Sequence, residues 1–543
     1  MKSNRLILVL ALIAIASNIV YLYPKLGYSP IPTQWEVGGG WGRYSIIEYG
    51  RIPQTEHSLT WQSDLKNYAT FDVMPKILAA MITIVTGTGN FPEGELFHSI
   101  FSWVGIIFLP LVVLYFYTYV SNKEGKKSNS FDVVLLYSFS VFPLASTLIS
   151  MSSGASVANG VARVLFLLLL VLLITIIGDQ KKRARRCAIF IFLLFPFFDY
   201  HHTWSYYLFI YFVVILLLTF RRRNERQLTG LAFSGIVIFF TSAVYFNTNL
   251  LEEPGRIITS FGQILVNFPS VSHESKINPN FSAYEPLGSI YSYLQYVNSA
   301  LILLICLVFF AVYVTRHRKQ PRPYEKILFY FLITETLILA GLFTWNGISG
   351  VYARVFEVMT YVSLLLAAYL LTKSGQKLKL ALRFMLLFSI SIAVLSYPFS
   401  PQQSGLSVTR EEFAGITFAG QHIPKTLYIF SDFRLGMPLL FFGQQGVKTI
   451  DAPNYPANVT EEILERCYYN VSNPESILDE YVGSSNYYVI TSSSGRQASI
   501  LDSSLRLFRP PSLDFEDKWS NQEDFNKIYS SDQLCVYNRV LPP

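Results

Sequence analysis

The stretch GVARVLFLLLLVLLITIIGDQKKRARR, residues 160–186, decides the fold. From residue 160 to Gly178 it is almost wholly apolar, and Arg163 is its only charged residue. A helix of about 20 residues crosses a hydrocarbon core about 30 Å thick. Five of the six residues in Lys181–Arg186 are basic, and such a cluster beside a span is typical of the cytoplasmic side. The stretch therefore predicts a membrane helix that ends in the cytoplasm.

The same combination of an apolar run and a basic flank recurs along the chain. Of the 543 residues, 51% are hydrophobic and only 15% are charged, whereas a soluble domain is about 25% charged. The fold class is therefore a polytopic α-helical membrane protein. We predict about eleven spans, near residues 5–23, 98–121, 132–150, 160–178, 187–198, 204–220, 228–248, 291–314, 326–344, 351–371 and 384–398.

Basic clusters fall at every second loop between these spans. They are Lys2/Arg5, Lys123/Lys126/Lys127, Lys181–Arg186, Arg221–Arg226, Arg316–Lys326 and Lys373–Arg383. The positive-inside rule then predicts a multi-pass protein of the cell membrane with a cytoplasmic N-terminus. The net charge of +7 lies largely in these short clusters, so it indicates no nucleic-acid partner. The first run resembles a signal peptide, but its continuation to Tyr23 favours an uncleaved span.

Two segments predicted to lie outside the cell are long enough to carry structure. Residues 24–97 form a long first outer loop, in which 72–87 is predicted to be an interfacial helix. Residues 1–398 are predicted to form the membrane domain and 399–543 an extracytoplasmic α/β domain. In that second domain the sequence predicts a helix at 410–422, strands at 426–432, 447–452 and 486–492, and a closing hairpin that ends with 533–541.

Sequons and cysteines agree with this topology. Three sequons, at Asn280, Asn458 and Asn470, all fall in segments predicted to lie outside, where N-glycosylation occurs. Cys467 and Cys535 lie in the predicted outer domain. An oxidising compartment would allow them to form a disulfide, while two free thiols are the alternative.

Four short motifs in a fixed order point to a known family. They are EYGRIP (48–53), PKILAAMITIVTG (75–87), DYHHTW (199–204) and NKIYSSDQLCVYNRV (526–540). Together with a first span, a long acidic outer loop and a C-terminal outer domain, this layout resembles the GT-C superfamily of integral membrane glycosyltransferases, especially its archaeal members. The resemblance implies an inverting transfer of a hexose or pentose from a polyprenyl-phosphate-linked sugar within the membrane lipid. The acceptor would be an extracytoplasmic glycan, lipid or glycoprotein.

Such a transfer needs a carboxylate that accepts the proton of the acceptor hydroxyl. The family usually carries an aspartate about fifteen residues before the glycine of the first loop, and here Glu36 stands near that place. We rank Glu36 first as the catalytic base, followed by Glu48, Asp64 and Asp72; the alternative for Glu36 is a solvated loop acid. Trp41, close to Glu36, offers an aromatic surface for a sugar ring.

The departing lipid phosphate needs cations or hydrogen-bond donors. Arg163 and Arg354 lie just inside the predicted outer ends of two spans, where basic residues are costly unless they are paired or functional. We predict that both bind the phosphate, with Arg256 as a third candidate. For Arg354 the alternative is an ion pair with Glu357, one turn later.

The DYHHTW motif lies at a predicted outer turn, level with the lipid headgroups. His201 and His202 are candidates for binding phosphate or positioning the acceptor, and Asp199 for orienting a histidine. The alternative is an ordinary interfacial aromatic belt with snorkelling histidines. Because no third ligand accompanies Asp199 and His202, the motif predicts no metal site. A divalent cation as cofactor stays open.

Two other classes of function remain as alternatives. One is a lipid or polysaccharide transporter, for which inverted repeats and charges near the bilayer midplane are expected; no repeat is evident. The other is a catalytically inactive relative that acts as a membrane scaffold or assembly factor, because the acid of the first loop is displaced. The Trp-Trp-Asp-Tyr-Gly motif of oligosaccharyltransferases is absent, which disfavours transfer of whole glycans to asparagine.

Overall fold

The chain, seen in a computed structural model, divides into two compact units. The first comprises Met1–Leu22, Phe71–Pro75 and Ile100–Pro401, and the second comprises Tyr23–Thr70, Lys76–Ser99 and Gln402–Pro543. The structure describes residues 34–36, 94–150, 157–179, 182–200, 202–222, 225–245, 286–316, 321–344, 351–396, 407–424, 427–430, 448–450, 478–479, 487–492, 499–500, 508–509, 525–531 and 534–539, and the single positions 9, 12, 16, 81 and 85.

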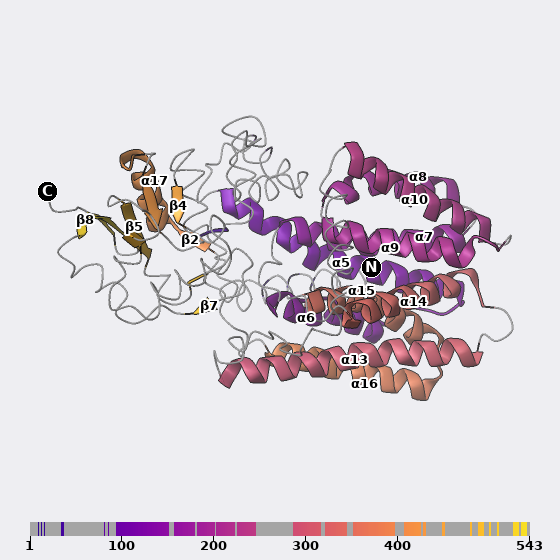
Figure 1. Cartoon of the computed structure of the whole chain (residues 1–543). Helices are drawn as coiled ribbons and strands as arrows, with labels where there is room; N and C mark the ends of the chain where they lie inside the picture. Colours follow the sequence, from indigo (N-terminus) through magenta and orange to yellow (C-terminus); the bar gives the residue numbers. More distant parts are fainter. Residues whose placement is uncertain are drawn as a thin grey trace, which may run out of the picture. The chain divides into compact units, whose positions relative to one another are not determined.

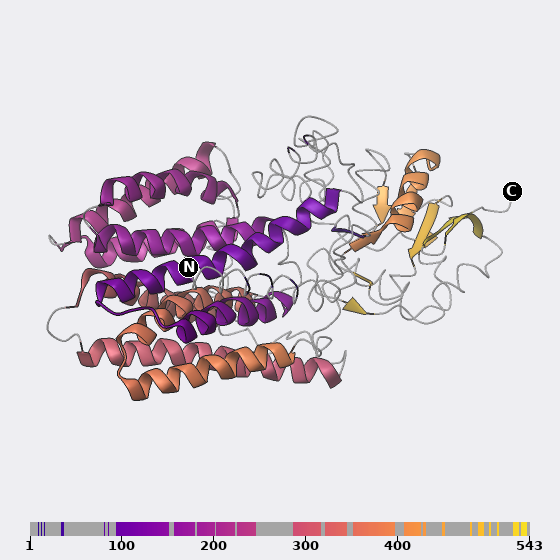
Figure 2. The same ribbon diagram turned by 180° about the vertical axis from the view of Figure 1, so that it is seen from behind.

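Ten long helices occupy the positions of the second to the eleventh predicted spans. They are α5 (Gly94–Lys123), α6 (Ser130–Ser150), α7 (Val157–Gly178), α8 (Arg183–Tyr200), α9 (His202–Thr219), α10 (Arg226–Tyr245), α13 (Pro286–Arg316), α14 (Pro323–Thr344), α15 (Val351–Lys373) and α16 (Gln376–Ser396). They lie side by side as a bundle (Figure 1), which the reverse view also shows (Figure 2).

Four of the described helical segments are long and apolar enough to cross a membrane. They are Val161–Gly178, Arg226–Tyr245, Val297–Thr315 and Gln376–Ser396. The helical fold class of a membrane protein is therefore confirmed, whereas the number of eleven spans stays a prediction. The first predicted span, 5–23, lies almost entirely outside the described residues.

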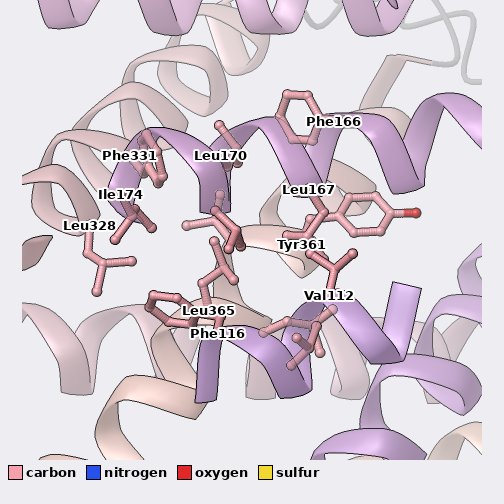
Figure 3. Close-up of a cluster of buried hydrophobic side chains, with 14 of the residues drawn as sticks. Val112, Phe116, Phe166, Leu167, Leu170, Ile174, Leu328, Phe331, Tyr361 and Leu365 are labelled. Carbon is pink, nitrogen blue, oxygen red and sulfur yellow. The ribbon is translucent and has the colours of Figure 1, made fainter. Parts of the chain in front are cut away.

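Helix α7 lies in the centre of the bundle. Of its segment Val161–Gly178, 72% of the residues are buried, compared with 28% in Gln376–Ser396 of α16. A helix that is hydrophobic on all sides is buried on all sides, which explains the run of leucines in α7. Figure 3 shows Phe166, Leu170 and Ile174 of α7 among side chains of α5, α14 and α15.

Close packing of α9 against α10 depends on one glycine. A Cβ atom at Gly235 would lie 2.3 Å from the Phe212 ring, closer than any real contact of that kind. Helix α10 therefore approaches α9 at a distance that only glycine allows. By contrast, a Cβ atom at Gly230 of the same helix would meet nothing within 4 Å.

The second unit contains a five-stranded mixed sheet in the order β4-β3-β5-β9-β8. Its strands are β3 (Tyr428–Phe430), β4 (Lys448–Ile450), β5 (Tyr487–Ser492), β8 (Phe525–Ser530) and β9 (Leu534–Arg539). Strand β3 is parallel to β4 and β5, while β9 is antiparallel to β5 and β8. Helix α17 (Arg410–His422) packs against β9. The predicted helix at 410–422, the three strands and the closing hairpin are confirmed.

Two short strand pairs were not predicted. Strands β6 (Ser499–Ile500) and β7 (Phe508–Arg509) are antiparallel. Strands β1 (Gln34–Glu36) and β2 (Ser407–Thr409) are also antiparallel, with Trp35 opposite Val408 and Glu36 opposite Ser407. The pairing of β1 with β2 joins residues of the long segment 24–97 to the residues that directly precede α17.

Candidate functional site

An aromatic cluster brings four helices together inside the bundle. The Phe166 ring of α7 lies 5.2 Å from Trp204 of α9 and 6.5 Å from both Phe197 of α8 and Tyr361 of α15. Trp204 and Tyr361 are themselves 5.4 Å apart. We call the end of the bundle on the Trp204 side of this cluster the aromatic end. Helices α7, α9 and α15 begin there, and α8 ends there.

Four of the residues singled out from the sequence lie on these helices at the aromatic end. Arg163 lies three residues before the ring of α7, and Asp199 two residues after that of α8. His202 lies two residues before the ring of α9, and Arg354 seven residues before that of α15. At 1.5 Å per residue, each is within about 11 Å of the rings along its helix axis. The fold therefore brings together segments that are far apart in the sequence.

The corner between α8 and α9 is tight, since only residue 201 separates the two helices. The Ser205 hydroxyl donates hydrogen bonds to the carbonyl oxygens of Phe197 at 3.5 Å and Phe198 at 3.1 Å. These carbonyls belong to the last turn of α8, which has no intrahelical partners for them. Ser205 thus caps α8 and fixes the corner that carries Asp199 and His202.

Arg163 has an unusual environment for an arginine, since its side chain is only 5% exposed. It lies in α7 one turn before the buried Phe166 and among apolar residues. A guanidinium at such a place is costly unless it is paired or serves a function. Its planar array of donors matches the oxygens of a phosphate group.

Many of the predicted site residues lie outside the described residues, so their roles stay predictions. They are Trp41, Glu48, Asp64, Asp72, His201, Arg256, Asn280, Asn458, Cys467 and Asn470. For Glu36 the structure gives the backbone position in β1. Cys535 is a buried, free cysteine in β9, with its sulfur 3.5 Å from the Ser530 hydroxyl. Because Cys467 lies outside the described residues, both the disulfide and the alternative of two free thiols stay predictions.

The opposite end of the bundle carries acids that are held in ion pairs, and we call it the ionic end. Asp132 of α6 is fully buried and accepts hydrogen bonds from Arg383 at 2.8 Å and Tyr117 at 3.1 Å. It also forms an ion pair with Lys379 at 2.7 Å. Each oxygen of this carboxylate is thus satisfied, and the group ties α5, α6 and α16 together.

Glu124 is a second hub at the ionic end. It accepts a hydrogen bond from Tyr324 at 2.7 Å, pairs with Lys373 at 2.8 Å and contacts Arg322. Burial raises the pKa of Glu124, but the hydrogen bonds from Lys373 and Tyr324 more than offset this, so the pKa lies below its ordinary value. Lys373 also lies 3.4 Å from the buried Glu325.

Further pairs at the ionic end follow the same principle. Glu225 lies 3.1 Å from Lys326 and accepts a hydrogen bond from Tyr330 at 2.8 Å, and Arg186 pairs with Asp179 at 3.1 Å. These acids are neutralised within the protein and are fixed between helix ends. The ionic end therefore has the character of a structural network rather than of a reaction site.

One polar pair lies deep in the bundle and was missed in the sequence. Glu335 of α14 is buried and accepts a hydrogen bond from the hydroxyl of Tyr211 of α9. The signal in the sequence is Glu335 itself, which stands in the middle of the apolar run 326–344, because an ionisable residue in such a run indicates a functional site.

The described residues hold no group of three or more His, Cys, Asp or Glu side chains placed to bind a metal ion. This part of the chain therefore offers no metal centre on which to build a mechanism.

The chain is similar in fold to solved GT-C glycosyltransferases, the resemblance that the sequence motifs indicated. The similar solved structures include the Archaeoglobus fulgidus oligosaccharyltransferase in its apo form, with a TM-score of 0.54, 11% identity, and coverage of 98% of this chain and 80% of that chain. The same enzyme in complex with Zn and sulfate gives a TM-score of 0.51 and 12% identity, covering 90% and 67%.

The match to ArnT from Cupriavidus metallidurans in the apo state covers 99% of both chains at 11% identity, with a TM-score of 0.47. No family model matches the chain, and no curated protein matches its sequence. At these identities, the likeness to solved structures extends to the fold.

Proposed function

We propose that the protein is a membrane glycosyltransferase that transfers a sugar from a polyprenyl-phosphate donor to an extracytoplasmic glycan, lipid or protein. The observation that carries this proposal is the placement of Arg163, Arg354, Asp199 and His202 on four helices that meet at the aromatic end. The GT-C fold supports it, since a structure of similar fold is an oligosaccharyltransferase. The aromatic end would then face outward, with the ionic end in the cytoplasm.

In the proposed reaction, the acceptor hydroxyl attacks the anomeric carbon of the donor sugar. A new C–O bond forms as the bond to the lipid phosphate breaks, and the phosphate leaves with the electron pair. Glu36 takes the proton of the hydroxyl. Arg163 and Arg354, with Arg256 as a third candidate, stabilise the negative charge of the leaving phosphate.

The corner of DYHHTW supplies the remaining polar groups. His201 and His202 bind phosphate or position the acceptor, and Asp199 orients a histidine. Trp41 provides a face for the sugar ring. A structure of similar fold was solved with Zn and sulfate, and a divalent cation stays a proposal for this chain; no step above depends on one.

The position of Glu36 supports its assignment as base. Strand β1 is paired with β2, so the backbone of Glu36 is held in an extended strand opposite Ser407. A carboxylate on a paired strand is positioned more precisely than one on an unpaired loop. The segment from 399 to 543 would in this way help to fix the base.

A lipid or polysaccharide transporter is the second candidate, and Glu335 is the observation that favours it. A buried acid within a helix bundle is a recurrent feature of transport pathways. A catalytically inactive scaffold is a third candidate, because Glu36 is displaced from the place of the usual aspartate.

The test is mass spectrometry of surface glycans and glycolipids in a deletion strain, complemented with wild type, Glu36→Gln or Arg163→Gln. Glu411→Gln is the control, since Glu411 is an exposed acid of α17. We expect a glycan shortened by one sugar that wild type and the control restore and the two variants do not. A glycan profile that deletion leaves unchanged would sink the enzyme proposal. Full restoration by Glu36→Gln would reject this base and move the assignment to Glu48, Asp64 or Asp72.

A further inference from the structure

Glu335 and Tyr211 form a hydrogen-bonded pair between α14 and α9 near the middle of the bundle. Glu335 lies twelve residues from the start of α14 and nine from its end, which corresponds to about 18 Å and about 14 Å along the helix axis. Both side chains are buried, and the Tyr211 hydroxyl donates to one carboxyl oxygen of Glu335. The other oxygen, Oε2, has no hydrogen-bond partner among the described residues.

Burying such a polar pair between two helices costs free energy, because both groups lose their contacts with water. Apolar side chains of similar volume pack as well or better than a buried polar pair, and a half-satisfied carboxyl adds a further cost. What a hydrogen bond adds is direction, because it fixes the orientation of the tyrosine ring. The pair is therefore explained better by the position that it imposes than by the stability that it contributes.

The ring of Tyr211 packs against two other aromatic rings in the core. It lies 5.3 Å from the ring of Phe331, one turn before Glu335, at 65° between planes. On its other side it lies 5.8 Å from the ring of Phe166 at 84°. Both contacts have the edge-to-face geometry that aromatic rings prefer, so a rotation of Tyr211 disturbs Phe166.

Phe166 and Arg163 are close neighbours along α7. The two residues are one turn apart on α7 and lie on the same face of that helix. Phe166 also contacts Trp204 and Tyr361, which belong to α9 and α15. The Phe166 ring thus links Tyr211 to the part of α7 that carries the arginine.

We propose that Tyr211 and Glu335 are positioning residues that hold Arg163, through Phe166, in the place where it binds the phosphate of a polyprenyl-phosphate lipid. The inference rests on the proposed function for the identity of the ligand. A displacement of about 1 Å in a positioned group can cost about 100-fold in a reaction. The Tyr211–Glu335 hydrogen bond lies farther from the phosphate than Arg163 does, so its loss should have a smaller effect. We expect it to weaken lipid-phosphate binding by about tenfold.

The test compares three variants of the full chain in detergent. Tyr211→Phe removes only the donor and keeps the ring, Glu335→Leu removes the acceptor, and Glu335→Gln keeps an amide oxygen in its place. Tyr137→Phe is the matched control, because Tyr137 is an equally buried tyrosine in α6 whose hydroxyl has no hydrogen-bond partner among the described residues. The probe is undecaprenyl phosphate, and the thermal midpoint is measured alongside its dissociation constant.

We expect Tyr211→Phe and Glu335→Leu to bind the probe about tenfold more weakly, with Glu335→Gln and Tyr137→Phe within twofold of wild type. Wild-type affinity in both Tyr211→Phe and Glu335→Leu would overturn the proposal. Equal losses in Glu335→Gln and Glu335→Leu would also overturn it, since the charge rather than the hydrogen bond would then matter. An equal loss in Tyr137→Phe would assign the effect to general destabilisation.

A second measurement does not depend on the ligand. The rate at which N-ethylmaleimide alkylates Arg163→Cys is followed by peptide mass spectrometry, with and without Tyr211→Phe. We expect the rate to change when the hydrogen bond is removed. If the wild-type protein binds no undecaprenyl phosphate, the proposed function fails while a changed rate still supports the positioning role. An unchanged rate overturns that role.

Discussion

The Arg383 side chain donates a hydrogen bond from Nε to Oδ1 of Asp132 over 2.8 Å, although 251 positions separate the two residues in the sequence. This contact joins the start of α16 to the start of α6. Because Asp132 is fully buried, its charge is compensated by Arg383 and by Lys379, 2.7 Å from its other oxygen.

We expect Asp132→Asn to lower the free energy of unfolding by about 3 kcal/mol, since removal of one member of a buried ion pair leaves its partners uncompensated. The thermal midpoint of the purified protein in detergent measures the loss. Glu411→Gln, at an exposed acid of α17, should change the midpoint little. Equal midpoints for Asp132→Asn and Glu411→Gln would refute the structural role of the ionic end.

The effect of an alanine substitution on stability can be compared at two glycines of α10, Gly235 and Gly230. We expect Gly235→Ala to destabilise the protein by about 1 to 3 kcal/mol, because the new Cβ atom would lie 2.3 Å from the Phe212 ring and force the helices apart. Gly230→Ala adds the same atom to open space, and should be neutral or stabilise the helix by up to about 1 kcal/mol. Thermal midpoints that fall equally for both would show that the α9–α10 contact is looser than described.

The helices were predictable because a membrane span is a continuous run of about twenty apolar residues in the sequence. The hairpin of β8 and β9 was predictable because its two strands are adjacent in the sequence. The ionic end was predictable only in part. Its basic clusters are local, but Asp132 finds Arg383 after 251 residues and Glu124 finds Arg322 after 198. The sequence around an isolated acid beside an apolar run does not indicate which distant residue will form its ion pair.

In the candidate site, too, single residues were predictable from the local sequence, whereas contacts between distant residues were not. Arg163 was singled out because a charge within an apolar run is a local signal. Its neighbourhood was not predictable, since Phe166, Trp204 and Tyr361 come together only through the packing of three helices. Glu335 was as visible as Arg163 in the sequence, but its partner Tyr211 lies 124 residues away.

Acid should weaken the ionic end through Glu124. Its folded-state pKa lies below the ordinary value, because hydrogen bonds from Lys373 and Tyr324 outweigh the effect of burial. The stabilisation is therefore fully present above the unfolded pKa, about 4.3, and is lost as the pH falls through the lower folded-state pKa. We expect wild type to be more stable than Glu124→Gln at pH 7, with the difference shrinking below about pH 4.

Thermal midpoints of the two proteins between pH 3 and pH 7 measure this effect. Glu411→Gln, compared with wild type over the same range, corrects for titration of exposed acids. A difference between wild type and Glu124→Gln that stays constant down to pH 3 would show that the Glu124 carboxylate contributes no ion pairing.

The proposed orientation places the turn between α5 and α6 in the cytoplasm. Lys127 is exposed in this turn, so a Lys127→Cys variant should react with a membrane-impermeant maleimide in inside-out vesicles and not in intact cells. Asn458 should in the same cells carry an N-glycan, which peptide mass spectrometry would detect. Labelling of Lys127→Cys in intact cells would reverse the orientation and remove the aromatic end from the outer face.

Two substitutions at Arg163 distinguish the effect of its positive charge from that of its planar guanidinium group. Arg163→Gln removes both, and should weaken binding of undecaprenyl phosphate by about 10- to 100-fold, since hydrogen bonds to charged groups contribute about 1.5 to 3 kcal/mol. Arg163→Lys keeps the charge but loses the planar pair of donors, so an intermediate loss is expected. Arg221→Gln, at an exposed arginine of the ionic end, should bind as wild type does. If Arg163→Gln binds the lipid phosphate as tightly as Arg221→Gln, the buried guanidinium serves packing and the phosphate site must be sought at Arg354.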